Sequence, residues 1–240
     1  MRVATIGSSH IAALKLAIRE GLFRPDKLDV VFWGVPEQAF GTIGYINGCF
    51  QTSHRDFVLT VSEGQYDELP AQNFDAIIFH GVKLKVALYL RSLRKTTDDL
   101  RSYSHSCLQE GLQSLIEETP EFRLARSLRT DYNRRVLISP LALTSERSRE
   151  FWGISIRNDE LTLLNSHISE ILSGIGVEYL AQPSDTVRDS KYTKHEFCAN
   201  SVRLFGDLKL KHPENDNVHM NSLYGARILQ EITTRLSVGA

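Results

Sequence analysis

The stretch RVATIGSSHIAALKLAIREG, residues 2–21, decides the fold class of this chain. Residues 3–6 are a short apolar run of strand formers, and residues 10–20 carry apolar side chains at helical spacing. The short turn between them contains Ser8 and Ser9, so a strand passes almost directly into a helix. A serine in such a turn is either a helix cap or a nucleophile presented at the end of the strand.

Strand-like and helix-like segments alternate along the rest of the chain. Apolar runs of strand length recur at residues 29–33, 76–79, 136–139 and 177–180, and helical patterns are found at about residues 97–117, 160–173 and 221–236. Runs that are apolar on both faces suit a buried parallel sheet, and their alternation with helices predicts an α/β layered fold. Because the sequence has no internal repeat and no low-complexity linker, we expect residues 1–240 to form a single domain.

The composition is that of a protein with a large apolar core and no strong charge. Hydrophobic residues make up 42% of the 240, and the formal net charge is −1 with charged residues spread along the chain. We therefore expect neither a nucleic-acid partner nor an anionic membrane partner. No apolar run has the length of a signal-peptide core or of a bilayer-spanning helix, so we expect a cytoplasmic protein.

Cysteine and histidine spacings show no metal or redox motif. Cys49, Cys107 and Cys198 lie far apart and lack Cys-x-x-Cys spacing, so we expect reduced, buried and inert thiols. No histidine and carboxylate spacing stands out as a ligand set, and we expect no metal.

Three long connections are expected, some of them around the ligand crevice, which in an open α/β sheet lies beyond the carboxyl ends of the strands. They span residues 34–50, 119–135 and 183–200, and the last is expected to be exposed. The arginines of the second connection begin at the spacing of one helix face: Arg123, Arg126, Arg129, Arg134 and Arg135. Such a face is either solvated or a site for an anionic ligand, such as the phosphates of coenzyme A.

A base for the serine is suggested near the C-terminus, in KHPENDNVHMNSLYGARILQEI, residues 211–232. Asp216 precedes His219 by three residues, just before an amphipathic helix. At this spacing the carboxylate can bond Nδ1 of the imidazole and leave Nε2 free to accept a proton. Ser9, at the carboxyl edge of the sheet, is the best candidate for the nucleophile that such a base would activate. Backbone N–H groups at the start of the next helix could stabilise an oxyanion.

Two further histidines lie near this predicted site. His10 follows Ser9 at the start of a helix, where its side chain is expected to point away from that of Ser9, so we interpret it as structural or as a substrate contact. His80 ends the third strand at the crevice edge and is a second candidate substrate contact, although a buried histidine bonded to the backbone is the commoner case.

The two ends of the chain together resemble the SGNH (GDSL-type) hydrolase superfamily, of which this would be a divergent member. The Gly-Asp-Ser of the family's first block corresponds to Gly7, Ser8 and Ser9, and the Asp-x-x-His of its last block to Asp216 and His219. The resemblance implies a flavodoxin-like three-layer α/β/α sandwich with a parallel five-stranded sheet. It also implies a catalytic triad with Ser9 as nucleophile, His219 as base and Asp216 as the residue that orients the base.

The sequence departs from the family pattern where the oxyanion is bound. The third block, Gly-x-Asn-Asp in the family, falls at FHGVKL, so Gly81 matches but Lys83 stands in place of the asparagine. Lys83 could donate to the oxyanion or bind an anionic part of the substrate; otherwise the site is degenerate. For the second-block glycine we favour Gly34 over Gly41 and Gly44, because it ends the second strand.

The resemblance implies a serine esterase that removes an acyl group of acetyl type from a carbohydrate or other small ester, without a cofactor. Two alternatives remain open: an acyltransferase with the same triad, for which coenzyme A would be a donor, and a binding protein that has lost catalysis. The sequence pattern does not indicate an oligomeric state.

Overall fold

The computed structural model describes residues 1–24, 28–84, 86–95, 99–147, 157–205 and 208–238. Its centre is a five-stranded sheet in the order β2-β1-β6-β7-β8, with every neighbouring pair parallel. The strands are β1 (Arg2–Gly7), β2 (Asp29–Gly34), β6 (Ala76–Val82), β7 (Arg135–Pro140) and β8 (Glu178–Tyr179). All five coincide with the apolar runs of the sequence, so the predicted parallel sheet is confirmed.

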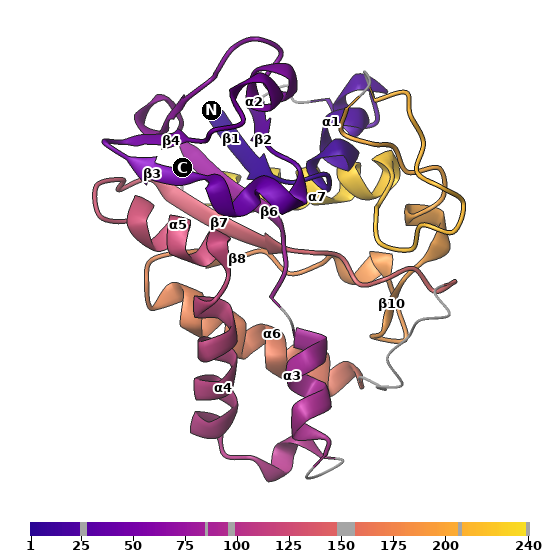
Figure 1. The fold of residues 1–240 in the computed structure, drawn as a ribbon. Helices are drawn as coiled ribbons and strands as arrows, with labels where there is room; N and C mark the ends of the chain where they lie inside the picture. Colours follow the sequence, from indigo (N-terminus) through magenta and orange to yellow (C-terminus); the bar gives the residue numbers. More distant parts are fainter. Residues whose placement is uncertain (25–27, 85, 96–98, 148–156, 206–207, 239–240) are drawn as a thin grey trace.

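The strand order is the flavodoxin-like one, in which the chain moves outward from β1 first to one side and then to the other. β1 therefore has β2 on one side and β6 on the other, and the carboxyl ends of β1 and β6 flank the point at which the direction reverses. Ligands bind at this point in open α/β sheets. Figure 1 shows β1 between β2 and β6. Ser9 is the second residue after β1, so the fold places it at this point.

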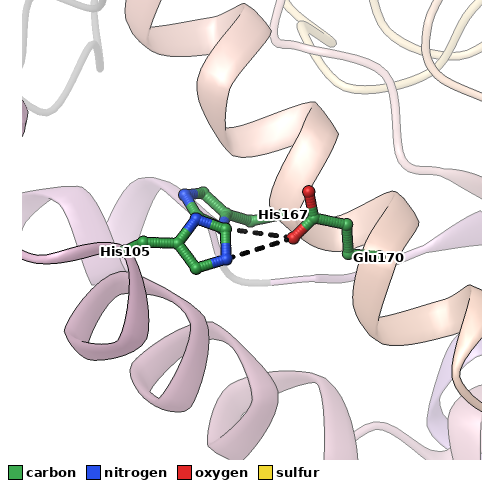
Figure 2. Close-up of side chains that lie close together, drawn as sticks. All are labelled: His105, His167 and Glu170. Atoms are coloured by element: carbon green, nitrogen blue, oxygen red, sulfur yellow. Dashed lines mark ion pairs between the residues drawn. The ribbon is translucent and has the colours of Figure 1, made fainter.

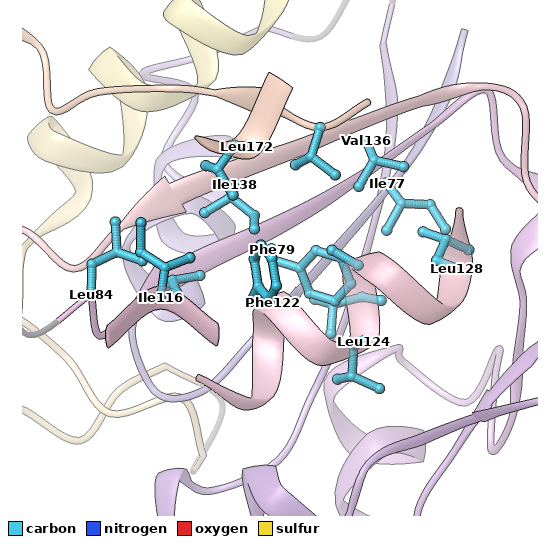
Figure 3. Packing of buried hydrophobic residues seen from close by; sticks show 14 of the residues in the cluster. Ile77, Phe79, Leu84, Ile116, Phe122, Leu124, Leu128, Val136, Ile138 and Leu172 are labelled. Carbon is cyan, nitrogen blue, oxygen red and sulfur yellow. The ribbon is translucent and has the colours of Figure 1, made fainter. Parts of the chain in front are cut away.

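Successive side chains of each strand point to opposite faces of the sheet, so they pack in two separate hydrophobic cores. On one face, Val3 of β1 and Ile78 of β6 pack with helices α1 (Ile11–Arg19) and α7 (Ser222–Ser237). On the other face, Ile77, Phe79 and their neighbours pack with α4 (His105–Glu117), α5 (Pro120–Leu128) and α6 (Asn158–Ser173). Figure 3 shows this second core, in which aromatic and aliphatic side chains from the helices cover β6 and β7. The fold is thus the three-layer α/β/α sandwich that the family resemblance implied.

The structure contains elements that the sequence patterns did not predict. They are the helices α2 (Arg55–Val61) and α3 (Val86–Leu93), and a small antiparallel sheet of β3 (Gly44–Ile46), β4 (Cys49–Gln51) and β5 (Leu69–Pro70). The helix α5 was indicated only by the spacing of the arginines in the expected connection at 119–135. The prediction of a long loop at 34–50 was wrong in part, because this segment contains the 3₁₀ helix Glu37–Thr42, β3 and the start of β4. The helix expected over 97–117 begins as α4 only at His105; residues 97–98 lie outside the described residues.

The connection at 183–200 is less exposed than predicted. It contains the hairpin of β9 (Val187–Arg188) and β10 (Tyr192–Thr193), and Thr186, Ser190 and Thr193 are buried. The cysteine prediction was also wrong in part. Cys198 is buried, but Cys49 is only half-buried and Cys107 is exposed; all three are free thiols. None of the helices within the described residues is long and apolar enough to cross a membrane.

Candidate active site

Ser9 lies in the turn between β1 and α1, and its hydroxyl does not cap the helix. The N-cap position of α1 is His10, which makes no side-chain capping bond. The turn is instead closed through the backbone, since the carbonyl oxygens of Ser8 and Ser9 accept hydrogen bonds from the first two N–H groups of α1, each at 3.2 Å. The Ser9 Oγ is bonded to His219 Nε2 at 2.8 Å, although the two residues are 210 positions apart.

Three glycines allow the strand ends beneath Ser9 to come together. A Cβ atom on Gly34 would lie 2.1 Å from the carbonyl oxygen of Gly7, and one on Gly7 would lie 2.6 Å from that of His80. Gly81 has a φ of +82°, and a Cβ there would lie 2.7 Å from the Cβ of His10. Gly34 and Gly81, predicted to bind the oxyanion or substrate, are therefore at the floor of the site, where close backbone packing alone already requires glycine.

His219 is oriented by Asp216, as the spacing of the two residues predicts. His219 Nδ1 lies 2.9 Å from Asp216 Oδ2, and the other carboxylate oxygen accepts the backbone N–H groups of Val218 and His219, both at 2.9 Å. With Nδ1 donating to the carboxylate, Nε2 is the acceptor that faces the serine. Ser9, His219 and Asp216 thus form a continuous chain of hydrogen bonds in the geometry of a serine hydrolase triad.

The carboxylate of Asp216 is kept ionised by its partners. Burial by itself would raise its pKa, but the hydrogen bonds from the His219 ring and from the backbone N–H groups of His219 and Val218 hold this pKa well below its usual value. An ionised Asp216 accepts the hydrogen bond from His219 Nδ1 and so fixes the orientation of the imidazole ring.

His212 completes the surroundings of the base and was missed in the sequence. Its ring stacks on that of His219 with centroids 3.8 Å apart and an angle of 9° between planes. Its Nδ1 also lies 3.2 Å from Asp216 Oδ2, the oxygen that bonds His219, so the carboxylate is shared by two imidazoles. Residues 212–216 are not helical, so the spacing of four residues between His212 and Asp216 was no signal of this contact in the sequence.

His10 lies on the opposite side of His219. Its ring is stacked at 4.8 Å between centroids, so His219 is held between two imidazoles. Burial and the nearby His219 lower the pKa of His10 well below its ordinary value, and burial lowers the pKa of His80 to about 4. The pKa of His212 is also lowered, mainly by burial and to a smaller extent by the nearby His219. These three rings are therefore biased towards the neutral form.

The remaining predicted site residues are placed as follows. His80 is buried, with Nδ1 3.1 Å from Ser139 Oγ, a side chain rather than the backbone partner expected for a strand-end histidine. The Nζ of Lys83 forms an ion pair with Glu37 of the 3₁₀ helix Glu37–Thr42, and both side chains are about half exposed. His10 thus packs against His219, His80 is buried against Ser139, and Lys83 lies at the surface.

The arginine-rich segment is largely used within the protein. Arg129 donates to the carbonyl oxygens of Tyr132 and Arg134, and Arg135 makes a two-bonded pair with Glu178 at 2.7 Å. Arg134 donates to the carbonyl oxygen of Phe74. Arg123 and Arg126 are exposed on α5, which confirms the helix-face spacing. Three of the five arginines that were considered for anion binding, Arg129, Arg134 and Arg135, therefore make contacts within the protein instead.

No family model and no curated protein matches this sequence. A structure described as a platelet activating factor from Streptococcus pneumonia is similar at 14% identity over 98% of this chain and 83% of its own, with a TM-score of 0.48. The periplasmic domain of a lipopolysaccharide acetyltransferase from Salmonella ser. Paratyphi A is similar at 11% identity over 98% and 83%, with a TM-score of 0.40. A GDSL-like lipase from Bacteroides thetaiotaomicron is similar at 14% identity over 98% and 86%, with a TM-score of 0.39. At these identities no residue role is transferred, and the candidate site rests on the geometry of this chain.

Proposed function

We propose that this protein is a serine esterase that removes an acyl group of acetyl type from a carbohydrate or other small ester. The observation that carries the proposal is the unbroken hydrogen-bond chain from Ser9 Oγ through His219 to Asp216, at 2.8 Å and 2.9 Å. A serine hydroxyl is a weak nucleophile at its ordinary pKa, and it gains reactivity when an oriented base accepts its proton. An N-capping serine would not need the far end of the chain as a partner.

The proposed reaction has two acyl-transfer steps. Ser9 Oγ attacks the ester carbonyl while its proton passes to His219 Nε2, and the tetrahedral intermediate collapses as the protonated His219 gives that proton to the leaving alcohol. Water, deprotonated by His219, then attacks the acyl-serine ester and releases the carboxylic acid and the free serine. Backbone N–H groups at the turn before α1 are the proposed oxyanion donors, supported by the positive end of that helix. Lys83, paired with Glu37, is not assigned this role.

The first test compares hydrolysis of p-nitrophenyl acetate by the wild type, Ser9→Ala and Ser8→Ala. Ser8 is the matched control, since it lies in the same turn but its side chain is not part of the proposed triad. We expect Ser9→Ala to lower kcat by at least about a thousand-fold and Ser8→Ala to retain most of the activity. Full turnover by Ser9→Ala would exclude the proposed nucleophile.

The identity of the acyl acceptor and the cellular location of the protein are two further parts of this proposal. Incubation with an acetylated sugar distinguishes water from a second sugar hydroxyl as acceptor, because transfer leaves the acetyl group on a carbohydrate whereas hydrolysis releases acetate. We propose hydrolysis and a cytoplasmic location. Coenzyme A binding that weakens on replacing Arg123 and Arg126 would instead favour an acyltransferase.

A further inference from the structure

A second group of histidine and carboxylate side chains lies away from the triad, on the other face of the sheet. His105 is the first residue of α4, and His167 and Glu170 are one turn apart on α6. Figure 2 shows the two imidazole rings and the carboxylate converging on one point between the helices. The rings of His105 and His167 have centroids 4.5 Å apart, with an angle of 49° between planes.

The spacing of these three groups suits a metal ion. Their ligand atoms all lie within 4.8 Å of one another. His105 Nε2 is 3.4 Å from Glu170 Oε2, and His167 Nδ1 is 3.9 Å from the same oxygen. Bonds of 2.0–2.1 Å from nitrogen or oxygen to a tetrahedral zinc ion place neighbouring ligand atoms about 3.3 Å apart. The first pair already has this separation, and the second needs a movement of about half an ångström.

The burial of His167 gives an independent reason to expect a ligand. Only 2% of its side chain is exposed, yet neither ring nitrogen has a hydrogen-bond partner among the described residues. A buried polar atom without a partner is costly, so such atoms are rare in folded proteins.

We propose that His105, His167 and Glu170 bind a divalent transition-metal ion, with zinc as the best match. Two imidazoles and one carboxylate are the borderline donor set that zinc accepts, whereas calcium and magnesium require mainly oxygen ligands. His105 and Glu170 are exposed, with side-chain exposures of 62% and 50%, so solvent reaches the metal and a water molecule completes the coordination. The ion would tie the beginning of α4 to α6. No local spacing in the sequence signals this group, because its three side chains come from two helices far apart in the chain.

The site does not depend on the proposed esterase activity, but the experiment must separate it from the triad. His212, Asp216 and His219 also bring their ligand atoms within 4.8 Å, so added zinc has a second place to bind. The variant His219→Ala removes that second group and leaves the α4–α6 site intact. His54→Ala is the matched control for loss of a histidine, since His54 belongs to neither cluster.

The test is a titration of the metal-free protein with zinc chloride, in which calorimetry measures the binding. We expect one zinc ion per chain in His219→Ala, and unchanged binding at the α4–α6 site in His54→Ala. Introducing His105→Ala or Glu170→Gln into His219→Ala should weaken this binding by more than about a hundred-fold, since even changes around metal ligands cost 10–100-fold. Both replaced side chains are exposed, so the folded state should persist, and circular dichroism checks this.

Thermal unfolding provides the second readout. Zinc should raise the Tm of His219→Ala by several degrees and should not raise that of His219→Ala carrying His105→Ala, because only a folded site binds the ion. Failure of His219→Ala to bind zinc would overturn the proposal, as would binding that is unchanged by both His105→Ala and Glu170→Gln. Full esterase activity in Ser9→Ala would overturn the proposed function and would leave these zinc results unchanged, so the two proposals fail separately.

Discussion

Lys83 is held by an ion pair with Glu37 at the rim of the candidate site, and this contact predicts a limited role in catalysis. Removing a principal oxyanion donor typically costs about 10²–10³ in kcat. Because the Lys83 ammonium is engaged with Glu37, we expect Lys83→Ala to lower kcat for p-nitrophenyl acetate by less than about tenfold. Steady-state kinetics of this variant measures the effect, and a loss of a hundred-fold or more would assign the oxyanion to Lys83.

At the scale of residues, the sequence identified the members of the hydrogen-bond chain but not their neighbours. Ser9 was identified by its turn, and Asp216 and His219 by a spacing of three residues that local geometry alone can satisfy. The stacking of His212 on His219 depends on the path of the chain between residues 212 and 219. The Lys83–Glu37 pair joins the segment after β6 to the 3₁₀ helix Glu37–Thr42, and no local pattern encodes such a contact.

At the scale of elements, the joining of Ser9 to His219 depends on the close approach of α1 and α7. A Cβ on Gly225 of α7 would lie 2.0 Å from the carbonyl oxygen of Ala13 and 2.8 Å from the backbone nitrogen of Leu14. Neither backbone atom can move without shifting α1, the helix that begins next to Ser9. Gly225 therefore sets the separation of the two helices, although α7 would otherwise gain from a better helix former.

We expect Gly225→Ala to push α1 and α7 apart, to destabilise the fold by about 1–3 kcal/mol, and to lower kcat/KM more than tenfold by lengthening the Ser9–His219 hydrogen bond. Urea unfolding and steady-state kinetics measure the two effects. Gly41→Ala is the control, because a Cβ there meets nothing within 4 Å. Wild-type activity in Gly225→Ala would show that the helix separation does not position the triad.

The elements that sequence patterns missed are short or are fixed by distant contacts. α2 has seven residues and α3 has eight, which is too few for a helical period to stand out from chance. α5 was recognised only through the spacing of its arginines, since its apolar face becomes clear once Phe122 and Leu128 are seen against β6 and β7 (Figure 3). β3 pairs with β4, and β4 pairs with β5. The segment that contains β3 is rich in glycine and has the composition of a loop.

At the scale of the whole molecule, buried neutral histidines make stability depend on pH. Burial lowers the pKa of His80 from 6.5 to about 4. Between these values the unfolded chain binds a proton that the folded chain does not, so His80 makes the free energy of unfolding fall as the pH falls through this window. From pH 7 to pH 5 the contribution is on the order of 2 kcal/mol.

We therefore expect His80→Gln to lose less stability than the wild type between pH 7 and pH 5. Urea unfolding at the two pH values measures the difference, and comparing each protein with itself removes the effect of the substitution at neutral pH. An identical pH dependence in both proteins would contradict a lowered pKa for His80.

The overall architecture was the most predictable level. Four of the five strands of the main sheet, β1, β2, β6 and β7, are buried on both faces over most of their length, which is the pattern of a parallel sheet covered by helices. The alternation of strands with helices indicated the layers. The strand order followed from the family resemblance and not from the patterns, because periodicity does not say which strand lies beside which. That order is what brings the turn after β1 to the crevice.

The central claim is that Ser9 is a nucleophile activated by His219. Reaction with a fluorophosphonate tests it most directly, because the probe forms a phosphonyl-serine bond with loss of fluoride only where a serine is activated. Intact mass and peptide mapping should show a single adduct on Ser9 in the wild type, none in Ser9→Ala, and a greatly slowed reaction in His219→Ala. An unmodified wild type, or an adduct that persists in Ser9→Ala, would contradict the account.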